Sequence, residues 1–164
     1  MKREEILLLL KEEGIAFELQ EHPAVKNMEE IAAVGLLYPE QDAKNLFIRD
    51  DKRNYYLLSI RGAKRIDLKQ FRRQEGLHSL SFAKSEEMQQ ILALSPGEVS
   101  PLGILNDEER KVTFFLDEEF QGALIGVHPN DNRATLWLSA ADLCKLILGH
   151  GNEVRYVPFQ EKRR

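Results

Sequence analysis

The irregular order of helix-like and strand-like segments restricts the fold of this chain more than any other feature of its sequence. Strand-like runs are expected at residues 15–19, 43–49, 55–60, 80–82, 112–116, 123–127, 134–138 and 153–157. Helical patterns are expected at residues 3–13, 27–34, 68–74, 85–92 and 139–148. Because these segments do not alternate as regular βαβ units, the sequence predicts an α+β fold in which helices flank a mixed, barrel-like β-sheet.

Turn signals separate these segments. Gly14, Gly35 and Gly149 are expected to end the first, second and last helices, since glycine is the usual residue after a helix C-terminus. The polar residues 50–54 are expected to close a hairpin between two strands. Residues 95–103 contain two prolines and two glycines, which disfavour a helix or a central strand, so this segment is expected to form a loop.

The chain has the length and apolar content of one domain. With 164 residues, of which 43% are hydrophobic, residues 1–164 are expected to form a single domain with its own core. The apolar run at residues 6–10 is too short for a signal peptide or membrane span, so a cytoplasmic protein without membrane contact is expected. The single cysteine, Cys144, excludes a disulfide within the chain, and its apolar helical context favours a small buried side chain over a nucleophile.

The overall charge argues against a large basic surface that grips nucleic acid. The formal net charge is -4 and the isoelectric point is near 5.7. Basic residues nevertheless gather at Arg61, Lys64, Arg65, Lys69, Arg72 and Arg73, and again at Lys162, Arg163 and Arg164. A local binding patch and a solvated helix face with a frayed terminus both explain these residues.

Common catalytic signatures are absent from the sequence. It contains no GxSxG, HExxH, Walker-type or GxGxxG motif, which removes the usual support for serine hydrolases, zinc proteases and nucleotide folds. One candidate for chemistry is Lys44, at the start of an apolar strand-like run, where a long cation can reach a phosphate or a polarised carbonyl. A surface lysine at a strand end is the alternative interpretation.

Two turns provide the other candidates. Residues 97–101 (GEVSP) combine a glycine with loop amides that can bind a carbonyl oxygen or a phosphate, although a plain connecting turn explains the same residues. His128 ends a strand-like run and precedes the turn at residues 129–132 (PNDN). A histidine in this position can hydrogen-bond a substrate, and a hairpin with a satisfied histidine is the alternative.

Five segments, taken in order, resemble the bacterial prolyl-tRNA editing domains, a YbaK-like fold that is also inserted into bacterial prolyl-tRNA synthetases. They are EHPAV (21–25), AKNLFIRD with YYLLS (43–50 and 55–59), SPGEVSPLGILND (95–107), GVHPNDN (126–132) and GHGNEVRYV (149–157). The resemblance spans nearly the whole chain. The sequence is most similar to the free-standing alanyl-tRNA(Pro) deacylases, whereas a sister group removes cysteine.

The resemblance implies hydrolysis of mischarged Ala-tRNA(Pro) by a site that uses neither a metal nor a cofactor. By position, Lys44 matches the essential lysine of the family and His128 its functionally important histidine, so both are the expected catalytic residues. The expected substrate-binding residues are Met28, Phe47, Ile48, Gly97, Glu98, Val99, Ser100, Pro101 and Asn130. The expected tRNA-binding residues are Arg61, Lys64, Arg65, Arg72 and Arg73. The expected partner is the acceptor end of tRNA(Pro), and prolyl-tRNA synthetase is a second candidate.

No residue stands out as a nucleophile, and an aminoacyl ester is already activated. Positioning and polarisation of the carbonyl are therefore expected to suffice for hydrolysis. Such an enzyme is needed because a synthetase pocket shaped for proline cannot exclude a smaller amino acid by sterics. Three alternatives stay open: a deacylase for Cys-tRNA(Pro) or another small amino acid, a noncatalytic module that binds tRNA or a synthetase, and a barrel that binds an unrelated small ligand.

Overall fold

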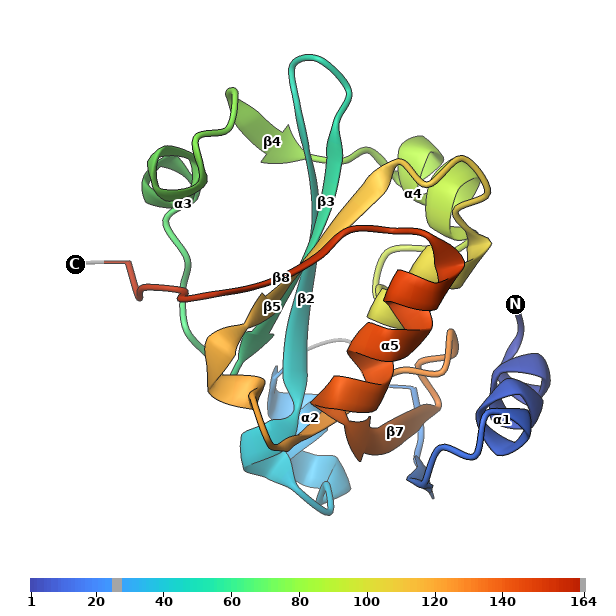
Figure 1. Cartoon of the computed structure of the whole chain (residues 1–164). Helices are drawn as coiled ribbons and strands as arrows, with labels where there is room; N and C mark the ends of the chain where they lie inside the picture. The colour runs from blue at the N-terminus through green and yellow to red at the C-terminus, as the bar shows by residue number, and fades with distance from the viewer. Residues whose placement is uncertain (25–27, 163–164) are drawn as a thin grey trace.

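The computed structural model describes residues 1–24 and 28–162, and it has the predicted α+β architecture (Figure 1). The helices are α1 (Arg3–Glu12), α2 (Met28–Val34), α3 (Leu68–Glu75), α4 (Ser85–Leu92) and α5 (Ala140–His150), with short 3-10 helices η1 (Pro39–Gln41), η2 (Pro101–Asn106) and η3 (Glu118–Phe120). The strands are β1 (Phe17–Glu21), β2 (Ala43–Asp50), β3 (Tyr55–Arg61), β4 (Leu80–Phe82), β5 (Val112–Asp117), β6 (Leu124–Val127), β7 (Ala134–Ser139) and β8 (Val154–Val157).

The strands form two sheets. The larger sheet has the order β4-β2-β3-β5-β8, and the smaller has the order β1-β7-β6. In the larger sheet β2 is antiparallel to both β3 and β4, whereas β5 is parallel to both β3 and β8. The smaller sheet is antiparallel throughout. The mixed pairing confirms the prediction of a mixed sheet.

A single parallel bridge joins the two sheets. Asp42, immediately before β2, pairs with Gly126 of β6. The described strands therefore form two sheets joined at one point rather than one closed barrel. This point, which we call the seam, brings the beginning of β2 next to the end of β6.

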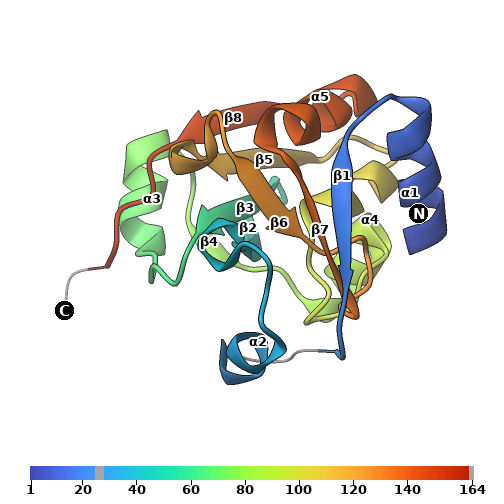
Figure 2. The same cartoon turned by 90° about the horizontal axis from the view of Figure 1, so that it is seen from below.

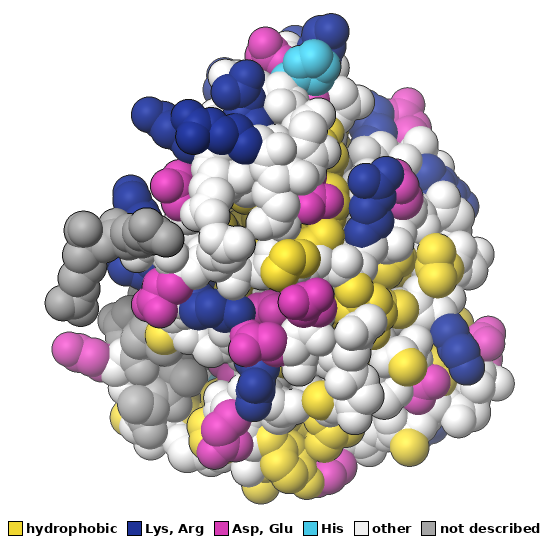
Figure 3. All heavy atoms as spheres, turned by 60° about the vertical axis from the view of Figure 1, so that its left-hand side comes forward, with side chains coloured by type: hydrophobic (Ala, Val, Ile, Leu, Met, Phe, Trp, Pro, Cys, Tyr) yellow, Lys and Arg dark blue, Asp and Glu magenta, His cyan; other side chains and the backbone are white. Residues whose placement is uncertain are grey.

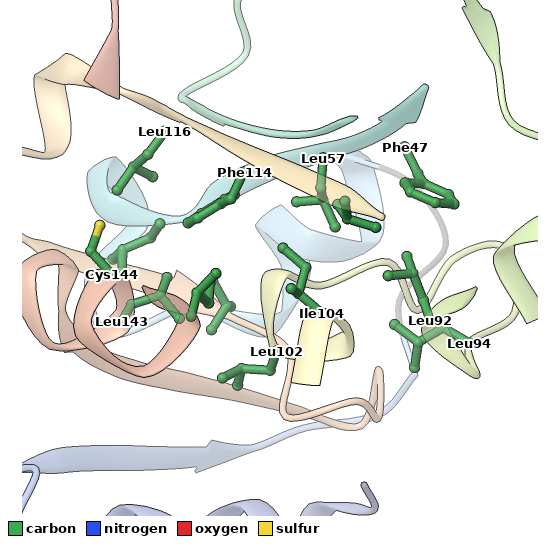
Figure 4. Close-up of a cluster of buried hydrophobic side chains, with 14 of the residues drawn as sticks. Phe47, Leu57, Leu92, Leu94, Leu102, Ile104, Phe114, Leu116, Leu143 and Cys144 are labelled. Atoms are coloured by element: carbon green, nitrogen blue, oxygen red, sulfur yellow. The ribbon is translucent and has the colours of Figure 1, made fainter. Parts of the chain in front are cut away.

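The main hydrophobic core lies between the two sheets and is completed by helices. Its labelled members are Phe47, Leu57, Leu92, Leu94, Leu102, Ile104, Phe114, Leu116, Leu143 and Cys144 (Figure 4). Burial of each large apolar side chain contributes about 1.5–3 kcal/mol. Cys144 is buried as predicted, and burial raises the pKa of its thiol.

A second cluster covers the other face of the larger sheet. Ile48 and Phe115 pack there against Phe71 of α3 and Phe159 of the C-terminal tail. Since neighbouring residues of a strand point to opposite faces, Phe47 faces the main core while Ile48 faces this second cluster. Figure 2 shows α3 and α1 at opposite ends of the molecule.

The last helix ends later than its sequence indicates. Gly149 was expected to end it, but α5 continues to His150, and Gly151 takes the left-handed conformation with φ 108°. The side-chain amide of the next residue, Asn152, donates to the carbonyl oxygen of Val112 at 2.9 Å and is buried. The prediction that Gly149 ends this helix was wrong, because the contact between Asn152 and Val112 fixes where the chain turns.

Two further boundaries differ from those expected by more than one residue. The first strand begins at Phe17 rather than residue 15, because Phe17 is the first residue that pairs with β7, opposite Leu138. Only the first part of residues 95–103 is an irregular loop, since η2 begins at Pro101. The expected start of the second helix at Asn27 lies outside the described residues.

Candidate active site

A hydrogen bond fixes the 97–101 loop to the end of β6. The hydroxyl of Ser100 donates to the main-chain carbonyl oxygen of His128 at 2.5 Å. The hydroxyl oxygen of Ser100 also accepts from the amide of Leu102 at 3.2 Å, so Ser100 caps η2. Ser100 is fully buried. The structure therefore brings the predicted loop into direct contact with the main chain of the predicted histidine.

The loop presents main-chain amides that are not used by the fold. In residues 1–24 and 28–162, the N–H groups of Gly97, Val99 and Ser100 have no hydrogen-bond acceptor, whereas that of Glu98 donates to the carbonyl oxygen of Ser95 at 3.0 Å. Gly97 has φ 90°, a conformation that glycine adopts without strain. Adjacent free amides can donate to one oxygen of a bound ligand.

Glu98 and Pro101 of the loop differ in exposure. Glu98 is half-buried, and its carboxylate accepts from the amide of Ser95 at 3.3 Å, which closes the turn. Pro101 is buried and begins η2. The loop is thus anchored at both ends, which limits the movement of its free amides.

His128 is half-buried, and its ring carries one defined hydrogen bond. Nδ1 lies 3.0 Å from the carbonyl oxygen of Ala134. A carbonyl oxygen can only accept, so Nδ1 carries the proton and Nε2 of the neutral ring is an acceptor. Burial lowers the pKa of His128, the bond to Ala134 raises it, and a positive charge on His22 would lower it further. The imidazole is therefore neutral near pH 7.

His22 lies beside His128 across β7. Its Nε2 is 2.9 Å from the hydroxyl of Thr135, and its Nδ1 is 2.8 Å from the carbonyl oxygen of Pro23. By strand alternation, His22, Thr135 and His128 lie on the face of the smaller sheet that points away from the main core. His22 was not among the predicted site residues, although its place in the EHPAV segment was a signal.

A tightly packed tryptophan borders this histidine pair. Gly126 lies against Trp137, and a β-carbon at Gly126 would meet the indole ring at 2.3 Å. Tyr38 packs edge-on against the same ring with the ring centroids 5.3 Å apart. The indole Nε1 is buried and has no partner in the described part of the chain. This arrangement requires glycine at the seam.

Asn130 holds the turn after His128 in place. Its side-chain amide donates to the carbonyl oxygens of Met1 at 3.0 Å and Leu102 at 3.5 Å. Its Oδ1 is buried without a partner among the described residues, and its backbone has φ 56°. Asn130 therefore contacts Leu102, the residue that follows the 97–101 loop.

The seam aligns Lys44 with His128. The parallel bridge pairs Asp42 with Gly126, and each of the two predicted catalytic residues lies two positions further along its segment. Strand alternation places both on the side away from the main core. Lys44 is exposed and has no ion-pair partner in the described ranges. No described hydrogen bond connects Lys44 to the 97–101 loop.

Asp42 adds a titratable carboxyl group at the seam. Burial raises its pKa to about 6, and a hydrogen bond from the amide of Ala43 partly opposes this shift. Asp42 precedes a strand and belongs to no recognised motif, so the sequence offered no signal for it.

The other predicted pocket residues are not all brought together. Phe47 and Ile48 are buried on opposite faces of β2, so they do not line one pocket. Phe47 stacks on Tyr55 in the main core with ring centroids 5.7 Å apart. Met28 is the first residue of α2, and its side chain lies outside the described part of the structure.

The predicted tRNA-binding residues fall into two groups. The ammonium group of Lys64 is 2.7 Å from the buried carboxylate of Asp117 and 2.5 Å from the half-exposed carboxylate of Glu119. Arg61 donates from Nε to the main-chain oxygen of Glu40 at 3.0 Å. These two cations stabilise the fold. The other predicted tRNA-binding residues, Arg65, Arg72 and Arg73, are exposed. Figure 3 shows Lys and Arg side chains gathered over α3 and near the C-terminal end.

No three side chains of His, Cys, Asp or Glu in the described ranges are grouped so that they could hold a metal ion. In the same ranges, no helix has both the length and the apolar character needed to cross a membrane.

Known proteins share this sequence over most of its length. The model of the aminoacyl-tRNA editing domain family matches residues 22–146. The prolyl-tRNA editing protein ProX of Acetoanaerobium sticklandii is 37% identical over 157 residues, which cover 94% of this chain and 96% of that protein. The prolyl-tRNA synthetase associated domain-containing protein 1 of Danio rerio is 32% identical over 148 residues, which cover 88% of this chain and 80% of that protein.

The fold is shared with known structures at lower identity. A crystal structure described as that of a candidate trans-editing enzyme for prolyl tRNA synthetase has a TM-score of 0.72 and 21% identity, with coverage of 98% of this chain and 97% of that one. The matches confirm the predicted editing-domain fold and the predicted class of enzyme, an aminoacyl-tRNA hydrolase. This chain belongs to the aminoacyl-tRNA editing domain family.

Proposed function

We propose that this protein removes alanine from mischarged tRNA(Pro) in the cytoplasm by hydrolysing the aminoacyl ester. The similarity to a prolyl-tRNA editing protein over nearly the full length of both chains supports tRNA(Pro) as the carrier. The observation that carries the proposal is the bond between Ser100 and the main-chain oxygen of His128, which joins a loop with free amides to a residue whose imidazole is neutral. Such a site can polarise an ester without a protein nucleophile.

The amides of Gly97 and Val99 are the proposed donors to the ester carbonyl oxygen and the terminal ribose, since neither residue is fully buried. Both N–H groups lack acceptors within the described residues, and both belong to a loop anchored by buried groups. Fixed donors of this kind stabilise the negative charge that develops on the oxygen when water adds. Their fixed position also lowers the cost of reorganisation during the reaction.

His128 is the proposed contact for the aminoacyl end. Because Nδ1 donates to Ala134, Nε2 presents a lone pair that can accept a hydrogen bond from the α-ammonium group of the amino acid. The lowered pKa keeps this acceptor available near pH 7. His128 would thus orient the ester carbon relative to the loop amides.

Lys44 supplies the positive charge in this mechanism. From its position at the seam, its ammonium group would engage a phosphate of the terminal nucleotide or the ester carbonyl oxygen. A water molecule, assisted by the ribose 2′-hydroxyl, adds to the ester carbon. The bond to the ribose 3′-oxygen then breaks, that oxygen takes up a proton, and free alanine and uncharged tRNA result.

The size of the amino acid is the proposed basis of selectivity. A pocket that accepts the alanyl methyl group but is too small for the pyrrolidine ring would spare correctly charged prolyl tRNA. Cysteine or another small amino acid is the alternative substrate, because one methylene changes binding by only about 1–3 kcal/mol. Rates of ester loss from tRNA(Pro) charged with alanine, cysteine or proline separate these cases.

A noncatalytic module that binds tRNA or prolyl-tRNA synthetase is the alternative from another class. Filter binding of tRNA(Pro), measured beside ester loss from Ala-tRNA(Pro), distinguishes the two. We expect binding together with turnover that exceeds the spontaneous rate. Binding with ester loss at the spontaneous rate would favour the module.

A further inference from the structure

A depression of about 540 Å³ lies beside the proposed active site, on the α3 side of the larger sheet. Four cations are among the residues that line it: Lys44, Arg65, Lys69 and Lys162. Lys44 is also a proposed catalytic residue, and it is the residue that the depression shares with the proposed site. We call this hollow the cationic depression.

The charges of the cationic depression are not neutralised by the fold. Arg65, Lys69 and Lys162 are exposed, and none has an ion-pair partner within residues 1–24 and 28–162. The one carboxylate that lines the depression, Asp67, accepts from the amides of Lys69 at 3.0 Å and Gln70 at 3.3 Å at the start of α3. In a protein with a net charge of -4, this local excess of positive charge favours an anionic ligand.

The C-terminal tail is held where it contributes to this surface. The amide of Lys162 donates to the carbonyl oxygen of Arg65, and Glu161 forms an antiparallel bridge with Ile66. These two contacts place the side chains of Lys162 and Arg65 at the same depression. The cations therefore come from distant parts of the chain but occupy defined positions.

An exposed aromatic ring completes the depression. Phe82, at the end of the edge strand β4, is 62% exposed, although most large apolar side chains of the described residues are buried. Leu46 and Ile66 provide a partly buried apolar floor beside it. A cationic groove with an aromatic side chain is the arrangement that binds single-stranded nucleic acid, because phosphates pair with the cations and a base stacks on the ring.

We propose that the cationic depression binds the single-stranded 3′ end of the substrate tRNA. Phosphates lie against Arg65, Lys69 and Lys162, and one unpaired base stacks on Phe82, so that the strand leads to Lys44. This inference rests on the proposed function. It also separates these cations from Lys64, whose charge is satisfied by Asp117 and Glu119.

The test measures RNA binding apart from hydrolysis. The probe is a fluorescein-labelled single-stranded RNA with the 3′-terminal sequence of tRNA(Pro) and no amino acid, and the readout is anisotropy over a range of salt concentrations. In the triple variant Arg65→Gln, Lys69→Gln and Lys162→Gln, the slope of log affinity against log salt is expected to become shallower by about 2, since each phosphate contact on a single strand contributes about 0.7.

The matched control replaces three exposed lysines elsewhere, in Lys11→Gln, Lys52→Gln and Lys145→Gln. These changes remove the same number of lysine or arginine charges from other surfaces, so the slope should change much less. An equal change of slope in the two triple variants would overturn the proposal, because general charge rather than the depression would then bind the RNA.

Substitutions of Phe82 test the stacking. Phe82→Leu keeps an apolar side chain but removes the ring, and it is expected to weaken RNA binding about five-fold or more, the lower end for stacking of one base. Phe82→Tyr keeps the ring and should bind like the wild type. Unchanged affinity of Phe82→Leu would overturn the proposed stacking.

Turnover by the wild-type protein distinguishes this inference from the proposed function. If mischarged tRNA loses its amino acid normally but RNA binding is unchanged in the variants of the depression, only the inference fails. If the variants weaken RNA binding but the wild-type protein shows no turnover, only the proposed function fails.

Discussion

The hydroxyl of Ser100 donates to the main-chain carbonyl oxygen of His128 over 2.5 Å, and this bond joins two segments that are 28 residues apart in the chain. It fixes the position of the 97–101 loop relative to the imidazole. Because Ser100 also caps η2, one side chain determines the path of the loop on both sides. The hydroxyl of Ser100 thus positions the proposed site, although it is not proposed to contact the ester.

Replacing this hydroxyl should affect both stability and activity. Ser100→Ala leaves a carbonyl oxygen of His128 and an amide of Leu102 without a partner, so the free energy of unfolding should fall by about 1–3 kcal/mol. Deacylation should slow as well, since the loop amides lose their fixed position. Urea denaturation and single-turnover ester loss measure the two effects. Ser95→Ala, at an exposed position before the same loop, should change the stability by less than about 0.5 kcal/mol.

Lys44 and Lys64 should respond differently to the same substitution. Lys44→Ala removes an exposed cation without a described ion-pair partner, so stability should change by less than about 0.5 kcal/mol. Its deacylation rate should fall by about 100-fold or more, the usual effect of losing one group that stabilises developing charge. Lys64→Ala should instead lower the free energy of unfolding by about 1–3 kcal/mol, because Asp117 is left buried without its cation. Full activity of Lys44→Ala would remove Lys44 from the mechanism.

The seam should not tolerate a larger residue. In Gly126→Ala the new β-carbon would meet the indole ring of Trp137 at 2.3 Å, and the forced movement should cost about 1–3 kcal/mol. Gly149→Ala is the matched control, since a β-carbon there has open space and the residue is helical, so it should stabilise the protein by about 0.5–1 kcal/mol. Thermal unfolding distinguishes them. Equal melting temperatures for Gly126→Ala and the wild type would contradict this packing.

The pKa of His128 predicts a dependence of stability on pH. Burial lowers this pKa below 6.5 in the folded protein, so the unfolded chain binds the proton first as the pH falls. The free energy of unfolding contributed by His128 is complete above pH 6.5 and declines below it until the folded-state pKa is reached. In His128→Asn this decline should disappear, with a difference in slope of at most about 1.4 kcal/mol per pH unit. Denaturation at several pH values tests it, and identical slopes would contradict the shift.

The contribution of Asp42 to the free energy of unfolding has the opposite dependence on pH. Its folded-state pKa is raised to about 6 from 3.8, so its contribution to stability decreases as the pH rises between these values. The contribution is present in both the wild type and His128→Asn, so it cancels in the difference between their slopes. The comparison therefore reports on His128 alone.

Local features of the fold could be predicted from the sequence. The bounds of α4 and the hairpin of β2 and β3 follow from patterns of apolar residues and turn residues close in the chain. The 97–101 loop and His128 were also recognisable, because glycine, proline and histidine have restricted local roles. Their direct contact through Ser100 was not predicted, since it joins distant segments.

Features that depend on distant pairing could not be predicted. Nothing in the local sequence indicates that β5 lies parallel between β3 and β8, or that Asp42 pairs with Gly126. For the same reason, the basic segment around Lys64 did not indicate that this cation is neutralised by Asp117. That residue lies 53 positions further along the chain. Phe47 and Ile48 were placed in one pocket on the basis of resemblance, whereas strand alternation separates them.

The most direct measurement is the rate at which the wild-type protein releases alanine from Ala-tRNA(Pro), compared with proline from Pro-tRNA(Pro) and with spontaneous hydrolysis of each ester. The proposed site predicts rapid loss of alanine while the prolyl ester decays at its spontaneous rate. Spontaneous decay of both esters, or equal enzymatic loss of both, would contradict it.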